Sequence, residues 1–215
     1  MKISKSSRWV MIGDSITDCG RVRPVGEGKD EALGKGYVNI VDAMLTAACP
    51  QLGIRVTNMG LGGNTVRGLK ERWQTDVIDL KPDWLSIMIG INDVWRHFDR
   101  PKQKEILVGI EEYEQTLTEL VERTLPLVKG MILMTPYFLD PNPDEPMRAM
   151  MDRYGCIVKK LAKKHAAILV DTQAAFDSVL QHVHPMALAL DRVHPALAGH
   201  AIIARALLKA LDFQW

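Results

Sequence analysis

The chain lacks a strong excess of charge of either sign. Its 27 Lys and Arg residues nearly balance its 26 Asp and Glu residues, so the formal net charge at pH 7 is +1. The basic residues are scattered along the sequence rather than clustered. Proteins that bind nucleic acid or acidic membrane surfaces carry a basic patch or stripe. We therefore expect neither a nucleic acid nor a membrane among the partners.

Long apolar runs are missing as well. No run approaches the roughly 20 residues that a membrane-spanning helix needs. Residues 1–15 contain no apolar core followed by a small-residue cleavage site, so we expect no signal peptide and a cytoplasmic location. The three cysteines, Cys19, Cys49 and Cys156, lie far apart without a C-x-x-C motif. This spacing favours reduced, structural thiols over a zinc site.

Internal repeats, low-complexity tracts and linkers are also absent, and we expect one domain over residues 1–215. What the sequence does contain is an alternation of two patterns. Short apolar runs, typical of strands covered on both faces, occur at 9–13, 54–58, 84–90, 131–135 and 167–171. Segments with helical periodicity occur at 37–49, 111–125, 147–166 and 195–213.

This alternation predicts the α/β class with a parallel sheet. Right-handed crossovers make a doubly wound five-stranded sheet of order 2-1-3-4-5 the simplest arrangement. Ligands of such sheets bind beyond the carboxyl ends of the strands, near the switch point between strands 1 and 3. We therefore expect functional residues directly after the first three strands, and long loops at 20–35 and 136–146.

Residues that can carry chemistry follow these three strands. Ser15 follows the first strand, a glycine-rich loop at 58–63 follows the second, and Asn92 follows the third. Ser15 at a helix N-terminus fits a nucleophile supported by the helix dipole, although Asp14 and Ser15 also suit plain helix caps. Asn92 suits either an oxyanion donor or a turn. The glycine loop lacks the spacings of the P-loop and of dinucleotide-binding motifs.

Near the carboxyl end, Asp191 and His194 lie three residues apart, which places both on one face of a helical turn. A carboxylate that accepts from Nδ1–H fixes the imidazole tautomer and leaves Nε2 as a base. A capped turn with a solvated histidine is the structural alternative. Pro195 then takes the first position of the final helix. Four other histidines lack a comparable acidic partner: His97, His165, His184 and His200.

A metal site is a competing arrangement. Its ligands would be Asp14, Asp18, Asp191 and His194, but none of the ligand spacings typical of metal-binding helices occurs. The serine arrangement uses all four signals in chain order, and three of them follow predicted strands. We therefore favour a serine nucleophile that needs neither a metal nor an organic cofactor.

Four blocks of the sequence resemble those of the SGNH hydrolases, also called GDSL esterases. They are "GDS" at 13–15, "NMGLGG" at 58–63, "GIND" at 90–93 and "DRVH" at 191–194. The resemblance implies a flavodoxin-like three-layer α/β/α sandwich. It implies a catalytic triad of Ser15, Asp191 and His194. It also implies an oxyanion hole formed by Ser15, Gly63 and Asn92. Gly63 is preferred to Gly60 and Gly62 because the family's glycine lies five residues after the asparagine.

Longer blocks resemble the intracellular bacterial acetylxylan esterases of this family and cover nearly the whole chain. They include "GDSITDCGR", "GNTVRGLKERW", "KPDWLSIMIGINDVWR" and "DRVHPALAGH". That group removes acetyl groups from xylo-oligosaccharides and forms homo-oligomers. The resemblance therefore implies an acetylated sugar or oligosaccharide as substrate and a homo-oligomeric assembly. Leu190 stands where an aromatic residue such as Trp is expected.

The substrate pocket is expected around the catalytic blocks. Ile91, Val193 and Trp95 would form its walls, and Asp14 adjoins the nucleophile. Trp95 and Tyr137 offer aromatic faces for a sugar, and the alternative places both in the core or in a subunit contact.

Other functions fit the same signals. A thioesterase or a lysophospholipase of the GDSL type is the alternative within the same chemistry. A non-catalytic, flavodoxin-like protein that binds a nucleotide or a flavin is the alternative from a different class, and an inert interaction subunit is the third.

Overall fold

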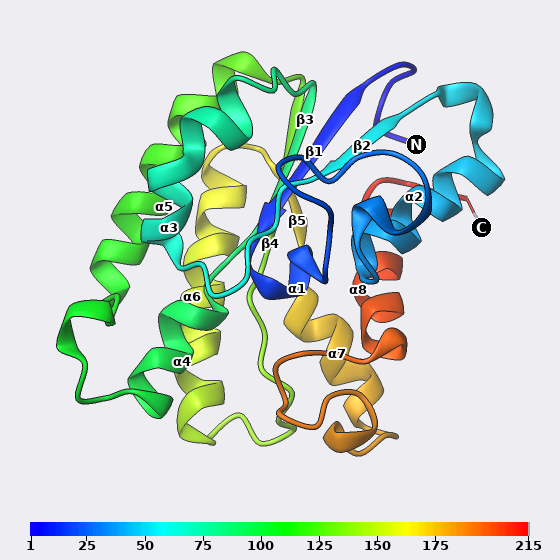
Figure 1. The fold of residues 1–215 in the computed structure, drawn as a ribbon. Helices are drawn as coiled ribbons and strands as arrows, with labels where there is room; N and C mark the ends of the chain where they lie inside the picture. Colours follow the sequence, from blue (N-terminus) through cyan, green and yellow to red (C-terminus); the bar gives the residue numbers. More distant parts are fainter. Residues whose placement is uncertain (215) are drawn as a thin grey trace.

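A computed structural model describes residues 1–214; residue 215, the last of the expected domain, lies outside the described residues. Its centre is a parallel sheet of five strands (Figure 1). The observed order, β2-β1-β3-β4-β5, confirms the prediction. The strands are β1 (Arg8–Gly13), β2 (Arg55–Asn58), β3 (Trp84–Met88), β4 (Gly130–Met134) and β5 (Ile168–Val170).

All five predicted strands are present, with ends that shift by one or two residues. β3 ends at Met88 rather than at Gly90, because the chain turns at Gly90 with a φ of 131°. Glycine adopts this backbone conformation without strain. A side chain at this position would also approach Pro136 and the hydroxyl of Tyr113 to about 3 Å. The tight turn allows the segment that follows β3 to enter a helix at once.

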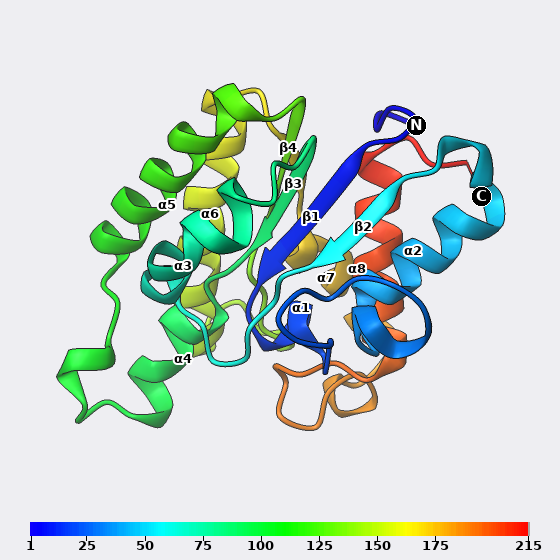
Figure 2. The ribbon, with the colours of Figure 1, turned by 45° about the horizontal axis from the view of Figure 1, so that its top comes forward.

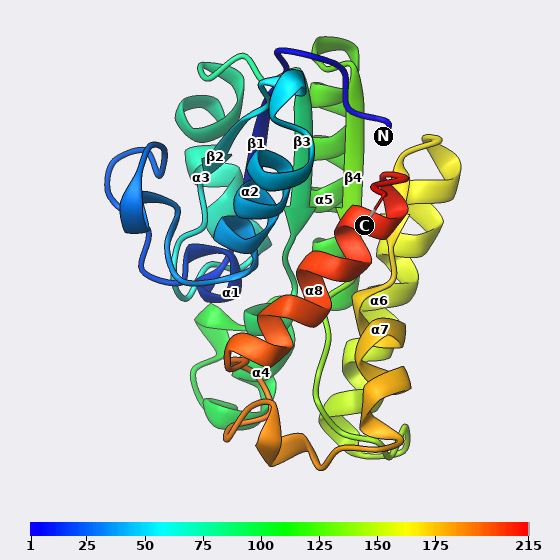
Figure 3. The ribbon, with the colours of Figure 1, turned by 90° about the vertical axis from the view of Figure 1, so that its right-hand side faces the viewer.

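Helices cover both faces of the sheet (Figures 1 and 3). One face carries α3 (Val66–Trp73), α4 (Ile91–Asp99), α5 (Ile110–Thr124) and α6 (Pro146–Lys164). The other face carries α2 (Tyr37–Ala48), α7 (Thr172–Leu180) and α8 (Leu197–Ala210). α8 packs against both α2 and α7, while α5 packs against both α3 and α6. This is the predicted three-layer α/β/α sandwich.

The final helix starts later than expected. α8 begins at Leu197 with Ala196 as its N-cap, so Pro195 precedes the helix instead of occupying its first position. The reason is a backbone bond from the N–H of Ala196 to the carbonyl of Leu188, at 2.7 Å. This bond closes the loop before α8 and keeps Ala196 extended, with a ψ of 176°.

The carboxyl ends of β1, β2 and β3 share one edge of the sheet. α1 (Ser15–Asp18), the start of α4 and the segment before α8 meet at this edge (Figure 2). It is the edge at which the strand order predicts a ligand site. No helix within residues 1–214 is both long and apolar enough to cross a membrane. Cys19, Cys49 and Cys156 carry free thiols.

Candidate active site

Ser15 and His194 are hydrogen-bonded at the carboxyl edge of the sheet. Ser15 is the first residue of α1, directly beyond β1, and its Oγ lies 2.9 Å from Nε2 of His194. On the other side of the ring, Nδ1 of His194 lies 2.7 Å from Oδ2 of Asp191. The carboxylate accepts a hydrogen bond from Nδ1–H, so the ring proton stays on Nδ1. The lone pair of Nε2 therefore faces the Ser15 hydroxyl, which donates a hydrogen bond to it. The three side chains have the geometry of a nucleophile, a base and a group that orients the base.

The carboxylate of Asp191 is also held by the main chain. Its Oδ1 accepts from the backbone N–H groups of Val193 and His194, at 3.0 and 2.8 Å. Asp191 and His194 therefore meet across an Asx-type turn, in which Arg192 has a φ of 61°, and not on the helical turn that was expected. Burial raises the pKa of Asp191, but the bonds from His194 and the two amides outweigh it, and this pKa lies below its usual value. The carboxylate stays ionised while it orients the ring.

The segment after β4 clamps this turn from behind. The hydroxyl of Tyr137 donates to the carbonyl of Val193 at 3.0 Å, and the N–H of Leu139 donates to the carbonyl of Arg192 at 3.0 Å. A left-handed backbone conformation is unfavourable for a residue with a side chain. The two bonds hold Arg192 in that conformation and so fix the direction of the residues on either side.

The glycine loop after β2 leaves one of its three glycine amides free. The N–H of Gly60 donates to the side chain of Asn58 at 2.9 Å, and the N–H of Gly62 donates to Oδ2 of Asp18 at 3.0 Å. The N–H of Gly63, whose φ is 77°, has no acceptor within the described residues. This distribution favours Gly63 over the other two glycines as an oxyanion donor.

The other two expected donors lie at the N-termini of helices. The N–H of Ser15, at the first position of α1, has no intrahelical acceptor. Asn92, the second residue of α4, is buried; its Nδ2 donates to the carbonyl of Asn64 at 3.0 Å, and its Oδ1 accepts from Nη2 of Arg96 at 2.9 Å. An amide NH₂ has two protons, so one remains for an oxyanion. Arg96 was not among the residues expected at the site, although its spacing of four residues from Asn92 places both side chains on the same face of one helix.

Two carboxyl groups are buried beside these donors. Asp14 caps α1 through a bond from the N–H of Ile16 to its Oδ1, at 3.0 Å. Oδ1 of Asp93 accepts from the N–H of Val66 at 2.9 Å, while its Oδ2 has no partner within the described part of the chain. Burial raises the pKa of each carboxyl to about 7, and the charge of Asp93 contributes to the shift of Asp14. Asp14 therefore acts as a helix cap, which was the alternative that the sequence left open for it.

The residues expected around the substrate differ in their exposure. Tyr137, Ile91 and Val193 are 0%, 2% and 1% exposed. The ring of Tyr137 packs against Phe176, with 4.4 Å between the ring centroids, so it has no face for a sugar and belongs to the core. Trp95 is partly exposed, and its ring centroid lies 5.7 Å from that of His194. Trp95 is thus the aromatic residue of this set that borders the site.

The competing metal site is not assembled. Oδ2 of Asp18 forms an ion pair with Arg23 at 2.6 Å and accepts from the N–H of Gly62 at 3.0 Å, while its Oδ1 has no hydrogen-bond partner within the described residues. Within residues 1–214, no three or more His, Cys, Asp and Glu side chains are grouped so that they could hold a metal ion.

Four of the other histidines contact groups outside the site. The buried His200 accepts from the N–H of Tyr37 at 3.2 Å, and its Nε2 lies 3.4 Å from Sγ of Cys19. Burial, followed by the charge of His194, lowers the pKa of His200 to about 4. His97 bonds to the carbonyl of Val108 and His184 to the N–H of Met186, while His165 faces Glu122.

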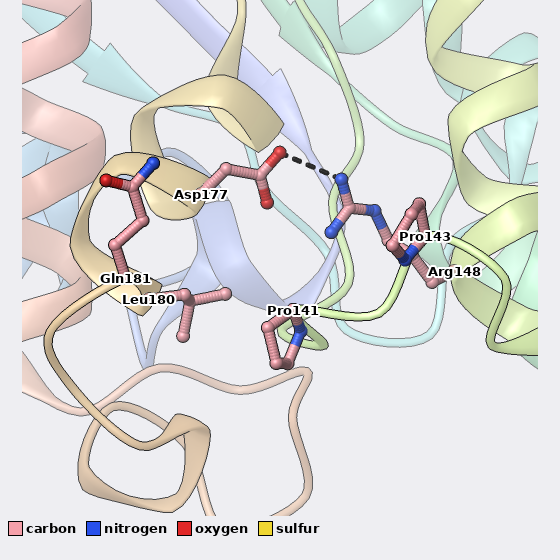
Figure 4. A pocket seen from close by; sticks show the side chains of 6 residues that line it. All are labelled: Pro141, Pro143, Arg148, Asp177, Leu180 and Gln181. Carbon is pink, nitrogen blue, oxygen red and sulfur yellow. Dashed lines mark hydrogen bonds and ion pairs between the residues drawn. The ribbon is translucent and has the colours of Figure 1, made fainter.

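Cavities adjoin the site on two sides. A cavity of about 450 Å³ borders Gly63, Arg96 and Arg100, and one of about 330 Å³ borders Leu190 and His194. A third cavity, of about 360 Å³, is lined by other residues: Pro141, Pro143, Arg148, Asp177, Leu180 and Gln181 (Figure 4). There, Arg148 and Asp177 point toward each other and form an ion pair at 2.8 Å. This third cavity contains none of the expected site residues.

Comparisons with known proteins agree with this geometry. The acetylxylan esterase of Geobacillus stearothermophilus is 58% identical over 215 residues, which is 100% of this chain and 98% of that protein. A crystal structure of this esterase, Axe2, matches with a TM-score of 0.99 at 58% identity, covering 100% of this chain and 98% of that one. LAE5, an α/β hydrolase enzyme from the metagenome of Lake Arreo in Spain, matches with a TM-score of 0.97 at 54% identity, covering 98% and 97%.

Three further structures of Axe2 are of catalytic mutants, S15A, D191A and H194A. Axe2 carries a tryptophan at its own position 190. Position 190 of this chain is a leucine, and its side chain is 83% exposed. The model of the GDSL-like lipase/acylhydrolase family matches residues 11–202. With the serine, the glycine loop, the asparagine and the histidine gathered at one edge of the sheet, the chain belongs to the GDSL-like lipase/acylhydrolase family.

Proposed function

We propose that the protein is a serine esterase that removes acetyl groups from acetylated xylo-oligosaccharides or related sugars through an acetyl-enzyme intermediate. The observation that carries the proposal is the relay from Ser15 Oγ through the His194 ring to Asp191, with contacts of 2.9 and 2.7 Å. Its substrate class is supported by the 58% identity to an acetylxylan esterase over the full chain. The catalytic mutants of that esterase change residues with the same identities and numbers, which supports the triad assignment.

In the first half of the proposed cycle, Oγ of Ser15 attacks the ester carbonyl while Nε2 of His194 takes its proton. The oxygen of the tetrahedral intermediate receives hydrogen bonds from the amides of Ser15 and Gly63 and from Nδ2 of Asn92. His194 then returns the proton to the leaving sugar oxygen, and the acetyl group remains on Ser15.

In the second half, His194 takes a proton from a water molecule that attacks the acetyl-enzyme. The same three donors stabilise the second tetrahedral intermediate, and acetate leaves as Ser15 regains its proton. Asp191 keeps the imidazole in one tautomer and stabilises its protonated form throughout. The cycle needs no metal ion and no organic cofactor.

Around this centre, we assign Trp95 to the substrate because it is partly exposed beside His194. Because Ile91 and Val193 are buried, we assign them to the packing beside Asn92 and His194, and we assign Asp14 to the cap of α1. We further propose that residues 1–215 form a single SGNH-hydrolase domain that works in the cytoplasm as a homo-oligomer.

The direct test is acetate release from acetylated xylo-oligosaccharides by the wild type and by Ser15→Ala. We expect the variant to be inactive with an unchanged melting temperature. Ser178→Ala is a matched control, because this hydroxyl is exposed on α7 and, among the described residues, bonds to the carbonyl of Ala175 in the same helix. Acetate release by Ser15→Ala at the wild-type rate would disprove the nucleophile assignment.

A series of esters and thioesters of increasing acyl length tests the substrate class. A sharp preference for acetyl oxygen esters supports the proposal, whereas a preference for long acyl chains or thioesters indicates a lysophospholipase or a thioesterase. The molar mass of the purified protein, measured in the same buffer, tests the homo-oligomer.

A further inference from the structure

The side-chain amide of Asn92 is held at both of its ends. One N–H of Nδ2 donates to the carbonyl oxygen of Asn64 at 3.0 Å. On the opposite side, Oδ1 accepts from Nη2 of Arg96 at 2.9 Å. Asn92 is 2% exposed, so water does not compete effectively for either bond. The amide therefore lies between an acceptor, the carbonyl of Asn64, and a donor, the guanidinium of Arg96.

These two neighbours select one of the two orientations of the amide. Rotation by 180° would place Oδ1 against the carbonyl of Asn64, where two acceptors repel each other, and NH₂ against the guanidinium of Arg96, where two donors repel each other. In that orientation an oxygen would also replace the N–H that faces the reacting carbonyl. A hydrogen bond to a charged group is stronger than one between neutral groups, so Arg96 supplies the larger part of the preference.

Arg96 is itself fixed in position. It lies one helical turn after Asn92 on α4, and its side chain is only 16% exposed. Its Nη1 binds Asp99, and its guanidinium lies 4.9 Å from the centroid of the Trp95 ring. An arginine whose other contacts are satisfied aims its remaining N–H groups in a defined direction.

The partner of Nδ2 is fixed as well. The side chain of Asn64 accepts from Nε of Arg72 at 2.6 Å, and the same arginine binds the carbonyls of Gly13 and Met59 at 2.9 and 2.6 Å. Arg72 thereby ties the ends of β1 and β2 to the loop that carries Asn64. Both groups that hold the Asn92 amide therefore have further contacts of their own that restrain their positions.

We propose that Arg96 is a positioning residue for catalysis: it locks the Asn92 amide so that Nδ2 points at the oxyanion, and its charge strengthens this N–H as a donor. The inference rests on the proposed function only in that Asn92 serves the oxyanion of Ser15-dependent ester hydrolysis. Arg96 acts on the reaction through Asn92. Its contact with the Trp95 ring, which we assign to the sugar, does not affect the hydrolysis of 4-nitrophenyl acetate, because this ester carries no sugar. The loss of Arg96 should therefore lower kcat and leave KM nearly unchanged, since a preorganised donor acts mainly in the transition state.

The first experiment compares Arg96→Met with Arg100→Met in the hydrolysis of 4-nitrophenyl acetate. Arg100 is the matched control: it borders the same cavity and also pairs with Asp99, at 3.9 Å, but makes no contact with Asn92. We expect kcat to fall by about 10- to 100-fold in Arg96→Met, with KM changed by less than about twofold. Both constants should stay within about twofold of wild type in Arg100→Met. Equal losses in the two variants, or a loss expressed only in KM, overturn the inference.

The second experiment repeats Arg96→Met in an Asn92→Ala background. If Arg96 acts only through the amide, its removal costs less than about a further twofold once the amide is gone. A full additional loss means that Arg96 acts on the substrate directly, and the inference is wrong. Arg96→Lys goes through the same double-mutant cycle, so the test stands even if Arg96→Met does not fold, as judged by its melting temperature. Failure of the proposed function is distinguishable, because Ser15→Ala would then remain active.

Discussion

Oγ of Ser15 and Nε2 of His194 lie 2.9 Å apart although 179 positions separate the two residues in the chain. The contact follows from the topology. β1 ends two residues before Ser15, and the segment before α8 returns to the same edge of the sheet, where the hydroxyl of Tyr137 and the backbone N–H of Leu139 hold it. The reactive pair therefore depends on long-range packing and not on any local motif.

Asp191→Asn should reduce kcat by about 10⁴-fold while the protein stays folded. An amide at this position can donate to Nδ1, which would move the histidine proton to Nε2 and remove the lone pair that faces Ser15. Steady-state kinetics with 4-nitrophenyl acetate measures the loss. Asp212→Asn, at an exposed carboxylate paired with Lys2, is the control and should keep full activity. A loss below about tenfold in Asp191→Asn would mean that this carboxylate does not set the tautomer.

Asn92→Ala should reduce kcat by about 10²–10³-fold, the usual loss when one oxyanion donor is removed. The two backbone donors remain in this variant, so it should keep more activity than Ser15→Ala. The measurement is kcat for acetyl esters, together with a thermal melt that shows whether the buried site tolerates alanine. Near-normal turnover by a folded variant excludes Asn92 from the oxyanion hole.

Tyr137→Phe should lower kcat several-fold, because it deletes one of the bonds that fix the turn between Asp191 and His194. Tyr154→Phe is a close control: its buried hydroxyl donates to the carbonyl of Val108 at 2.8 Å, comparable to the 3.0 Å bond from Tyr137 to Val193. Each variant should lose roughly 1–2 kcal/mol of stability, since a buried carbonyl loses its donor. Only Tyr137→Phe should lose activity; equal kinetics in the two variants would assign Tyr137 a purely structural role.

The sequence predicted the strand order, because the apolar runs mark each buried strand and crossover handedness limits their arrangement. It also predicted where Ser15 and Asn92 lie, because residues that directly follow parallel strands share one edge of the sheet. These features depend on the local pattern of apolar residues, which the sequence shows directly, and on general rules of sheet topology, which apply to any parallel sheet.

What the sequence left open depends on the backbone path between elements. Tyr137 reads as an aromatic suited to a sugar, and only the packing of the 136–146 loop on the turn before α8 shows that its ring is buried. Pro195 reads as a helix start, but a bond from Ala196 to Leu188 delays α8. Such bonds join residues that no periodicity relates to one another.

Asp93→Asn should change stability in a pH-dependent way. The pKa of Asp93 is raised from 3.8 to about 7 in the folded chain, chiefly by burial. As pH rises from 4 to 7, the unfolded chain has already released this proton while the folded chain still holds it. Folding is therefore penalised increasingly over this window, and the full penalty applies above pH 7. The variant removes the penalty because an amide does not ionise.

Urea denaturation at pH 5 and pH 8 measures the effect. Relative to wild type, Asp93→Asn should gain about 2–3 kcal/mol in its free energy of unfolding between these pH values, at about 1.4 kcal/mol per pKa unit. Asp83→Asn is the control, because the pKa of Asp83 is shifted in the opposite direction. The bonds from Lys129 and from the N–H of Arg8 lower it. Asp83 is ionised in both states from pH 5 to pH 8, so its variant should show a constant deficit. A constant difference for Asp93→Asn as well would mean that this carboxyl ionises in the folded chain as it does in water.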